Sequence, residues 1–361
     1  MSLDLSADLV SLLRTITDVE SVSGNEKELA DLIEEAMRTL GHLEVHRDGD
    51  AVIARTNLGR PERVVIAGHI DTVPVAGNLP SRLEEGERGL HVVGRGTCDM
   101  KAGVAVQLKL AAELAEPNRD ITWIFYDNEE VGADENGLGR VAENSPELLE
   151  ADFAVLMEPT DAQIEGGCQG VLRILITVPG KAAHAARSWL GVNAIHGLSD
   201  VLDRLNAYEA REVVVDDLTY HEGLNAVLVS GGVATNVIPP SARIEVNYRY
   251  APDKTTEEAL AELRRVFEGH SFDINDVSPA ARPGLDQPLA RAFVESVGQP
   301  ARPKYGWTDV ARFSELGIPA VNYGPGDPSL AHTDHEYCPA NQLDQCAEGL
   351  RVWLSNQEDD A

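Results

Sequence analysis

Five side chains that commonly bind metal ions lie in short polar segments. Each segment follows an apolar run or opens a helix. The residues are His69, Asp99, Glu130, Glu158 and His332. In an open α/β sheet the loops after the strands meet at one edge, so we expect these side chains to converge. Imidazoles combined with carboxylates favour zinc, because magnesium and calcium prefer all-oxygen ligand shells.

The arrangement that best uses these five ligands holds two zinc ions per subunit, for which Co²⁺ is an expected substitute. Adjacent ions roughly 3.5–4 Å apart need a shared ligand, and an aspartate can bridge them with its two oxygens. We expect Asp99 to be this bridge, with His69 and Glu158 completing one site and Glu130 and His332 the other. Each ion then has three protein ligands and an open position, as catalytic zinc requires.

Each residue taken alone also has a simpler interpretation. His69 could be an ordinary loop histidine, and Asp99 could be a helix N-cap, which is a common use of aspartate. Glu129 and Glu130 could be a solvated charge pair. The joint order of the segments along the chain is what favours a metal site.

Two further acidic residues have expected roles in catalysis. If Glu129 and Glu130 sit on an extended segment, their side chains diverge, so one of them is free to act as a general base. That base would take a proton from the attacking water and deliver it to the leaving amine. Asp71 is placed to accept the second imidazole N–H of His69 and so fix its tautomer, although a turn-capping role is the alternative.

Composition limits the partners and the compartment. The chain has 361 residues, 43% of them hydrophobic, which indicates two folded domains. Its net charge of -30 disfavours nucleic acid and anionic membranes as partners. An anionic substrate would therefore need a local cluster of arginines. The four cysteines lie far apart, with no CxxC pair. With no visible signal peptide and no apolar run long enough to span a bilayer, we expect a cytoplasmic protein.

The apolar periodicity predicts an α/β fold: a doubly wound, mostly parallel sheet forms the catalytic domain, and a ferredoxin-like α+β domain is inserted in it. The catalytic domain is expected over residues 1–170 and 285–361, and the insert over 171–284. Helices are predicted at 7–18, 26–40, 100–115, 193–205, 255–267 and 289–297. Strands are predicted at 51–54, 64–67, 121–126, 153–157, 171–178, 225–230, 242–248, 272–277 and 320–323.

Taken together, the polar segments resemble the aminoacylase/carboxypeptidase family of dinuclear zinc hydrolases. The matching segments are 69–74 (HIDTVP), 96–101 (GTCDMK), 129–130 (EE), 158–160 (EPT) and 331–332 (AH), in the family's order. The resemblance implies that Glu129 is the general base. It also implies that His332, rather than His335, is the ligand, because the family histidine directly follows a glycine-rich loop. The insert would be the dimerisation lid, so the resemblance implies a homodimer.

The resemblance also assigns residues around the substrate. His184 is similar to the family histidine that enters the partner subunit's active site and stabilises the oxyanion; its alternative is a surface histidine at a helix start. Asn236 and Arg249 match positions that bind a substrate carboxylate. Expected substrate contacts also come from segments that resemble one branch of the family: Arg187, Thr308 and Gly324.

That branch, of actinobacterial type, hydrolyses N-succinyl-L,L-diaminopimelate to succinate and L,L-diaminopimelate, a step of lysine and diaminopimelate biosynthesis. An N-acetylornithine deacetylase-like enzyme, a zinc dipeptidase or a carboxypeptidase is the alternative. An inactive regulatory member that only binds metal is a further alternative, against which the retained Glu129 argues. Arg173 and Arg312 are either further carboxylate receptors or solvated surface charges.

Overall fold

The chain folds into two compact units in a computed structural model that describes residues 2–132 and 134–355. Unit 1 contains the residues up to Gly166, then Pro283–Arg302, and the residues from Arg312 onward. Unit 2 contains Gly167–Arg282 and Pro303–Ala311. No sequence pattern indicated that 303–311 would join the second unit. In the part of the chain described here, no helix is long and apolar enough to cross a membrane.

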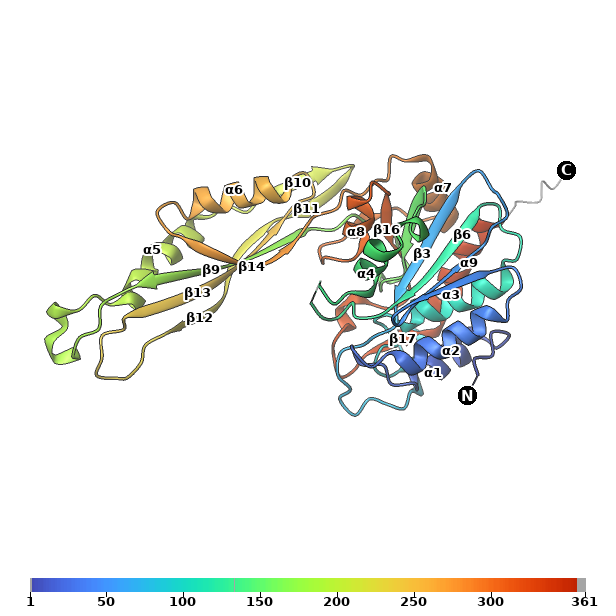
Figure 1. The fold of residues 1–361 in the computed structure, drawn as a ribbon, viewed down its shortest axis with the longest axis horizontal. Helices are drawn as coiled ribbons and strands as arrows, with labels where there is room; N and C mark the ends of the chain where they lie inside the picture. The colour runs from blue at the N-terminus through green and yellow to red at the C-terminus, as the bar shows by residue number, and fades with distance from the viewer. Residues whose placement is uncertain (1, 133, 356–361) are drawn as a thin grey trace. The chain divides into compact units, whose positions relative to one another are not determined.

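Unit 1 is built on a mixed sheet of eight strands (Figure 1). Their order is β1-β2-β6-β3-β7-β16-β8-β15. The four neighbours β6, β3, β7 and β16 are parallel, whereas β1, β2 and β8 pair antiparallel. The bounds are β1 Glu44–Asp48, β2 Ala51–Arg55, β3 Arg63–His69, β6 Asp120–Tyr126, β7 Phe153–Leu156, β8 Glu165–Gly166, β15 Arg302–Pro303 and β16 Ala320–Asn322.

The central strands are buried on both faces, which explains their continuous apolar runs. Every residue of β6 and β7 is buried, and so is every residue of β3 after Arg63. Such runs are typical of strands covered by helices on both sides. The predicted α/β class is confirmed, with antiparallel strands at the margins of the parallel centre. Strand β1 was not predicted, because its sequence, EVHRD, is mostly polar. Its residues are at most partly buried.

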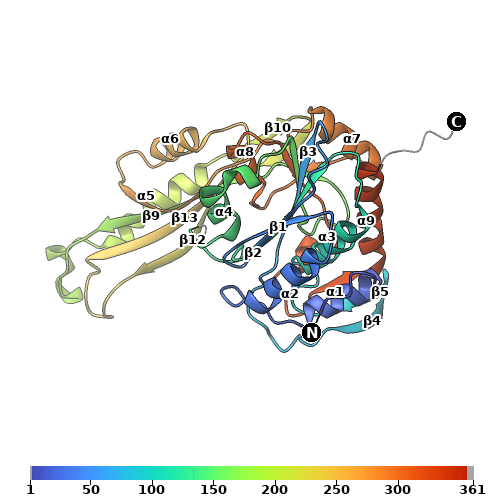
Figure 2. The ribbon, with the colours of Figure 1, turned by 45° about the vertical axis from the view of Figure 1, so that its right-hand side comes forward.

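Helices α1, α2, α3, α7 and α9 contribute to one apolar core with the sheet. Helix α3 is buried almost all round, because it packs on β3 and also against α1 and α9 (Figure 2). A small sheet, β17-β5-β4, adjoins these helices, and α4 packs against β2. The bounds are α1 Leu9–Thr17, α2 Lys27–Arg38, β4 Arg82–Gly86, β5 Gly89–Val93, α3 Lys101–Glu113, α4 Gly137–Asn144, η1 Pro146–Leu148, α7 Pro288–Val297, α8 Val310–Glu315, η3 Pro328–Leu330, β17 Tyr337–Pro339 and α9 Ala340–Leu354.

Unit 2 is an antiparallel sheet with two helices packed on one face. The sheet order is β12-β13-β9-β14, and α5 and α6 contact β9. Alternate residues of β13, such as Ile244, Val246 and Tyr248, are buried in a core shared with the helices. The bounds are β9 Gly170–Pro179, η2 Ala185–Leu190, α5 Ala194–Ala207, β10 Glu212–Val215, β11 Leu218–His221, β12 Gly223–Gly231, β13 Ser241–Tyr250, α6 Thr256–Val266 and β14 Phe272–Ser278. The β10–β11 hairpin was not predicted.

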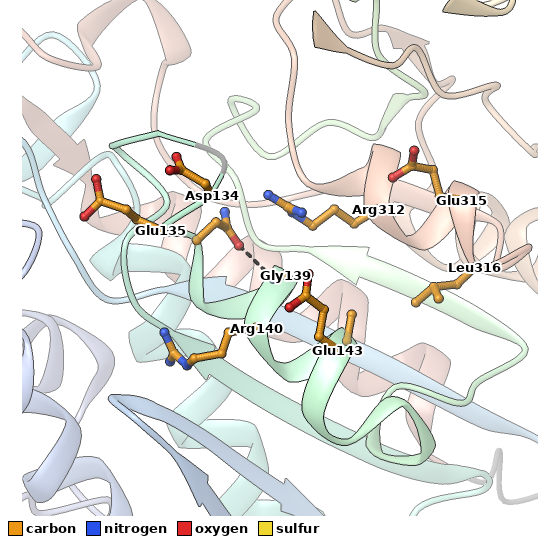
Figure 3. A pocket seen from close by; sticks show the side chains of 10 residues that line it. Asp134, Glu135, Gly139, Arg140, Glu143, Arg312, Glu315 and Leu316 are labelled. Carbon is orange, nitrogen blue, oxygen red and sulfur yellow. Dashed lines mark hydrogen bonds between the residues drawn. The ribbon is translucent and has the colours of Figure 1, made fainter. Parts of the chain in front are cut away.

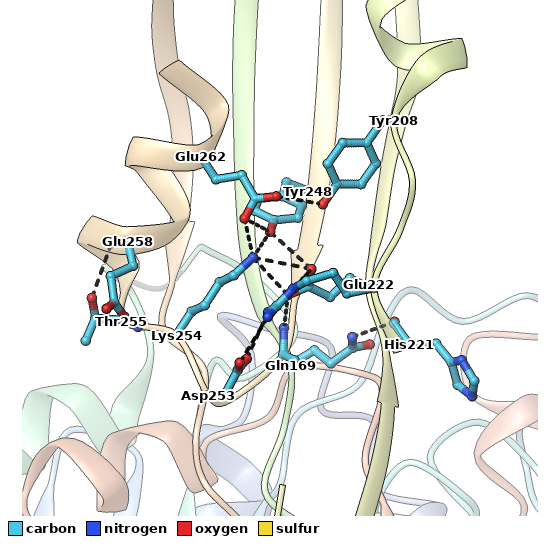
Figure 4. A network of polar contacts seen from close by, with 12 residues as sticks. Gln169, Tyr208, His221, Glu222, Tyr248, Asp253, Lys254, Thr255, Glu258 and Glu262 are labelled. Atoms are coloured by element: carbon cyan, nitrogen blue, oxygen red, sulfur yellow. Dashed lines mark hydrogen bonds and ion pairs between the residues drawn. The ribbon is translucent and has the colours of Figure 1, made fainter. Parts of the chain in front are cut away.

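A buried polar network ties unit 2 together where the β10–β11 hairpin meets the sheet (Figure 4). The fully buried carboxylate of Glu222 accepts hydrogen bonds from Arg211, at 2.7 Å and 2.9 Å, and from the Ala251 amide at 3.0 Å. Lys254 lies 3.2 Å from the same carboxylate. Burial opposes ionisation of Glu222, but Arg211 holds its pKa below the usual range. Removing one partner from such a network typically costs about 3–5 kcal/mol, so Glu222 is a structural residue.

Candidate metal centre

The five predicted ligands all belong to unit 1 and lie at one edge of its sheet. His69 is the last residue of β3, and Glu158 follows β7. Glu130 lies in the bend after β6, and Asp99 comes just before α3. Because β3, β6 and β7 are parallel, their carboxyl ends share an edge. His332 reaches the same place from the loop after η3.

Among the described residues, two of the three groups of possible ligand atoms share Asp99. His69, Asp99 and Glu158 form one group, and Asp99, Glu130 and His332 form another, with the atoms of each group within 4.8 Å of one another. Nε2 of His69 lies 3.3 Å from Oδ1 of Asp99. Nε2 of His332 lies 3.5 Å from Oδ2 of Asp99 and 2.8 Å from Oε2 of Glu130. The two oxygens of Asp99 therefore face different histidines.

The charge of this cluster suits a pair of divalent cations. Carboxylates of Asp99, Glu129, Glu130 and Glu158 gather around only two imidazoles. His69 and Glu158 are buried, and the side chain of Asp99 is only 12% exposed. Several like charges in a poorly hydrated site are costly unless cations or protons offset them. Nitrogen together with carboxylate oxygen is a donor set that zinc accepts.

The backbone at Glu129 and Glu130 is not the extended segment that was assumed from the sequence. Glu129 and Glu130 do not lie on a strand but in a bend, after Asn128 with a φ of 58°. Their carboxylates do not diverge fully, because both come within 4.8 Å of a His69 ring nitrogen. Glu130 also belongs to the group with Asp99 and His332, whereas Glu129 does not. Glu130, the expected ligand, therefore differs from Glu129, the expected base, in its proximity to Asp99 and His332.

Asp71 contacts both the histidine and the acidic bend. Its Oδ1 lies 3.2 Å from Nδ1 of His69. Its two oxygens also accept the backbone N–H groups of Glu129 and Glu130, each at 3.0 Å. The fully buried Asp71 carboxylate thus orients the imidazole and holds the bend that carries the two glutamates. Ser23 donates a further hydrogen bond to it at 2.7 Å.

Several buried charged residues near the ligands received no role from the sequence, among them Glu26, Glu336 and Arg95. Glu26 accepts the Asn128 amide at 3.2 Å, next to the acidic bend. Glu336 accepts the amides of Cys98 and Asp99, and Arg95 donates to Glu336. Asp99 is not an N-cap, since that position of α3 belongs to Met100. Arg95 lies between two glycines, but Glu26 and Glu336 lie in polar stretches, so the sequence carries no signal for these contacts.

The two histidines are strongly basic in the absence of metal. Hydrogen bonds to Asp99 and Glu130 raise the pKa of His332 to about 10. Burial opposes the charge on His69, but Asp71 and Asp99 raise its pKa well above the usual value. Both shifts favour the protonated imidazole in the metal-free protein. A metal ion binds the neutral ring, so it must displace these protons.

We expect zinc loading of the metal-free protein at pH 7 to release about two protons per chain, one from each histidine. Since the raised pKa favours the protonated ring, the apparent affinity should increase by about tenfold per pH unit for each ion between pH 6 and 8. Calorimetric titration in buffers of different ionisation enthalpy measures the proton count. Zinc binding without proton release would show that the histidines are already neutral.

Gly324 lies against the Glu158 loop. A Cβ at this position would come within 2.3 Å of the Met157 carbonyl oxygen and 2.6 Å of that of Glu158. The Gly324 amide donates to the Thr160 hydroxyl at 3.0 Å, and its carbonyl accepts the Thr160 amide. Glycine is thus required for the close approach of the two loops. Its expected contact with substrate stays a prediction.

The other predicted substrate residues belong to unit 2 and lie at two ends of its sheet. The loops of His184 and Asn236 are paired, with the Ala185 amide donating to the Asn236 carbonyl at 2.9 Å. Arg187 follows in η2, and all three residues are exposed. Thr308 is buried.

Arg249 lies at the opposite end of β13 from these paired loops. It pairs with Val171, whereas Ser241, at the start of the strand, pairs with Pro179. The strand between Ser241 and Arg249 spans about 25 Å at ~3.3 Å per residue. His184 lies beyond its Ser241 end, bridged to Val237. One small substrate therefore cannot contact His184 and Arg249 of the same chain.

The three undecided residues are each placed by the structure. Arg173 pairs with Asp276 at 3.1 Å. His335 is exposed and belongs to none of the metal-binding groups among the described residues. Arg312 lines a pocket of about 390 Å³ between α4 and α8 (Figure 3). That pocket also contains the acidic side chains of Asp134, Glu135, Glu143 and Glu315.

The fold and this cluster define a metal-dependent hydrolase of the α/β type with an inserted domain, and comparison with known proteins gives the family. Residues 65–356 match the model of peptidase family M20/M25/M40, so the chain belongs to that family. It is 52% identical to a putative succinyl-diaminopimelate desuccinylase of Mycobacterium tuberculosis, over 98% of this chain and 99% of the relative. It is 47% identical to a succinyl-diaminopimelate desuccinylase of Corynebacterium glutamicum, over 98% of both chains.

Solved structures show the same fold at lower identity. A tripeptidase of Staphylococcus aureus superposes with a TM-score of 0.78 at 21% identity, covering 98% of both chains. A dinuclear metal-binding M20 peptidase of Bacillus subtilis gives a TM-score of 0.72 at 20% identity, covering 96% of both chains. These structures support the architecture, with its catalytic and inserted domains.

Proposed function

We propose that this protein hydrolyses the amide bond of N-succinyl-L,L-diaminopimelate and releases succinate and L,L-diaminopimelate. The observation that carries the proposal is the pair of ligand groups joined at Asp99, in a chain whose relatives at 47% and 52% identity bear this activity in their names. A cytoplasmic location is part of the proposal. The four cysteines are free and buried, which fits a reducing compartment.

We propose two zinc ions per subunit. His69 and Glu158 would hold one, Glu130 and His332 the other, and Asp99 would bind both. When bound, such ions polarise the amide carbonyl and lower the pKa of the attacking water. The chain itself supplies the cluster of ligands, the orientation of both imidazoles and the carboxylate that moves the proton.

Glu129 would act as general base and then as general acid. Its backbone N–H is fixed by Asp71, and its carboxylate lies at the edge of the ligand cluster. It would accept a proton from the attacking water and deliver the proton to the departing amine nitrogen. Asp71 would keep Nδ1 of His69 as the donor, so that Nε2 faces the Asp99 side of the cluster.

Arginines of unit 2 would bind the carboxylates of the substrate. The chain carries a net charge of -30, so its overall field opposes an anionic ligand. Arg187 and Arg249 offer planar guanidinium groups that pair with carboxylates, and Asn236 offers an amide. Burial lowers the pKa of Arg249, and an ionic partner would offset that burial.

A homodimer would bring the two ends of the unit 2 sheet to different active sites. Strand β12 is an edge strand, and its Val227, Leu228 and Val229 are exposed. An unpaired edge with exposed apolar side chains favours pairing with a second copy of the chain. His184 would then serve the partner's site, while Arg249 would serve the site of its own chain.

Mixed dimers test whether His184 acts across subunits. A dimer of one Glu129→Gln chain and one His184→Ala chain keeps one intact site only if His184 acts in the partner. Random re-association of the two inactive variants should therefore restore about one quarter of wild-type activity. Activity that stays at the level of the separate variants would place His184 in the site of its own chain or outside the site.

A substrate panel tests the proposed reaction. The zinc-loaded protein is offered N-succinyl-L,L-diaminopimelate, N-acetylornithine and a set of dipeptides, each with and without a chelator. We expect chelator-sensitive release of succinate and no comparable turnover of the other compounds. Turnover of dipeptides alone would overturn the desuccinylase assignment, and absence of any hydrolysis would favour an inactive metal-binding protein.

A further inference from the structure

We propose that the buried ion pair of Arg95 and Glu336 is a positioning device for the metal centre, and that it determines the affinity of the ion held by His332. The inference rests on the proposed metal centre and adds two residues that are not among its expected ligands. It concerns metal binding, so it can be tested without any substrate.

Glu336 holds the backbone that carries the shared ligand. Its side chain is only 1% exposed. Oε1 accepts the backbone N–H groups of Cys98 and Asp99, each at 2.9 Å. A carboxylate that accepts two adjacent amides fixes the direction in which the Asp99 side chain leaves the backbone. The bridging geometry requires that direction, because each oxygen of Asp99 must face a different histidine.

Arg95 connects Glu336 to two further loops. Its side chain is 3% exposed, and Nη1 donates to Oε2 of Glu336 and to the Thr333 carbonyl, both at 3.0 Å. Nε donates to the Pro74 carbonyl at 3.1 Å. Thr333 directly follows His332, and Pro74 ends the segment that begins at His69. One ion pair therefore links the loops of His69, Asp99 and His332.

The two metal sites depend on this link to different degrees. His69 is the last residue of a central strand and is buried, so the sheet itself holds it. His332 lies in a loop, its side chain is 56% exposed, and its φ is 64°. A loop histidine in that conformation needs its neighbours to fix it. Arg95, held by Glu336, anchors this loop through the Thr333 carbonyl, so loss of the ion pair should weaken the His332 site first.

Burying the carboxylate of Glu336 next to the backbone of Asp99 also has an energetic cost. A buried carboxylate must be offset by a partner and by hydrogen bonds, because burial opposes its charge. Arg95 offsets that charge through a charge-assisted hydrogen bond. Such a buried ion pair is expected where the backbone that Glu336 holds must be rigid. A shared metal ligand meets that condition, because outer contacts of this kind typically change metal affinity by about 10–100-fold.

Zinc titration of Glu336→Ala, Glu336→Gln and Arg95→Lys tests the proposal. We expect Glu336→Ala to weaken one of the two zinc affinities by about 10–100-fold and the other by less than about threefold. The zinc affinity of Glu336→Gln should lie between those of the wild type and Glu336→Ala. Its amide oxygen can still accept the N–H groups of Cys98 and Asp99, while its NH₂ group faces Arg95. Excess zinc should restore full occupancy of both variants.

A double variant identifies the affected site. Combining Glu336→Ala with His332→Ala should weaken the remaining zinc no further than His332→Ala alone, since both changes act on the same site. Glu222→Gln is the matched control, because Glu222 is an equally buried, arginine-paired carboxylate in unit 2. It should lower the melting temperature and leave both zinc affinities unchanged.

Two results would overturn the proposal: folded Glu336 and Arg95 variants with both affinities at the wild-type value, or an equal loss at both sites. If Glu336→Ala does not fold, the zinc affinities of Glu336→Gln and Arg95→Lys test the proposal instead, since both substitutions nearly keep the volume of the side chain. Failure of the succinyl substrate test would leave this result intact, because zinc affinity is measured in the absence of substrate.

Discussion

Replacing Glu129 with Gln should lower kcat by about 10³-fold while the protein still binds its full complement of zinc. The amide has the shape of the carboxylate but cannot accept a proton, and a positioned general base contributes about 10²–10⁴-fold. Asp71 holds the Glu129 amide, so the bend should keep its conformation. Zinc content after dialysis and steady-state hydrolysis of the succinyl substrate measure the two effects separately.

Glu130→Gln is the control for this variant. Its carboxylate lies 2.8 Å from Nε2 of His332 and within the group that includes Asp99. We expect it to lose one zinc, and to lose activity for that reason. If Glu129→Gln loses zinc while Glu130→Gln keeps it, the roles of base and ligand are reversed. The proximity of both carboxylates to His69 makes this reversal a real alternative.

The sequence indicated the central strands and the ligand loops because both leave local signals. The runs that became β3, β6 and β7 are continuous and apolar, as strands buried on both faces must be. Polar residues directly after these runs fall at the carboxyl edge of a parallel sheet. His69, Glu130 and Glu158 could therefore be expected near one another from the sequence alone.

The features that were missed depend on contacts distant in sequence. Arg95 and Glu336 are 241 positions apart, and neither has a pattern that indicates its partner. The bend at Asn128 requires a positive φ, which a non-glycine residue seldom signals. The extended segment assumed for Glu129 and Glu130 was therefore the wrong local structure. The segment 303–311 joins unit 2 through tertiary packing alone.

Replacing Asp99 with Ala should remove zinc from both sites, a larger loss than any other single ligand would cause. Burial opposes ionisation of Asp99, but hydrogen bonds to His332 and His69 hold its pKa below the usual range. Its carboxylate is thus charged at neutral pH, with one oxygen toward each histidine. Without it each ion has two protein ligands, and three are typical of a catalytic zinc.

Single-site variants give the reference for this loss. Glu158→Gln and His332→Ala each change a ligand that belongs to one group only, so each should remove about one zinc per chain. Zinc content of the dialysed proteins, measured by atomic absorption, compares the three variants. Two zinc ions retained by Asp99→Ala would contradict the shared-ligand arrangement. If Asp99→Ala retains one ion, Asp99 is a ligand of a single site. The ligand common to both sites would then be His69, which also lies close to Glu129 and Glu130.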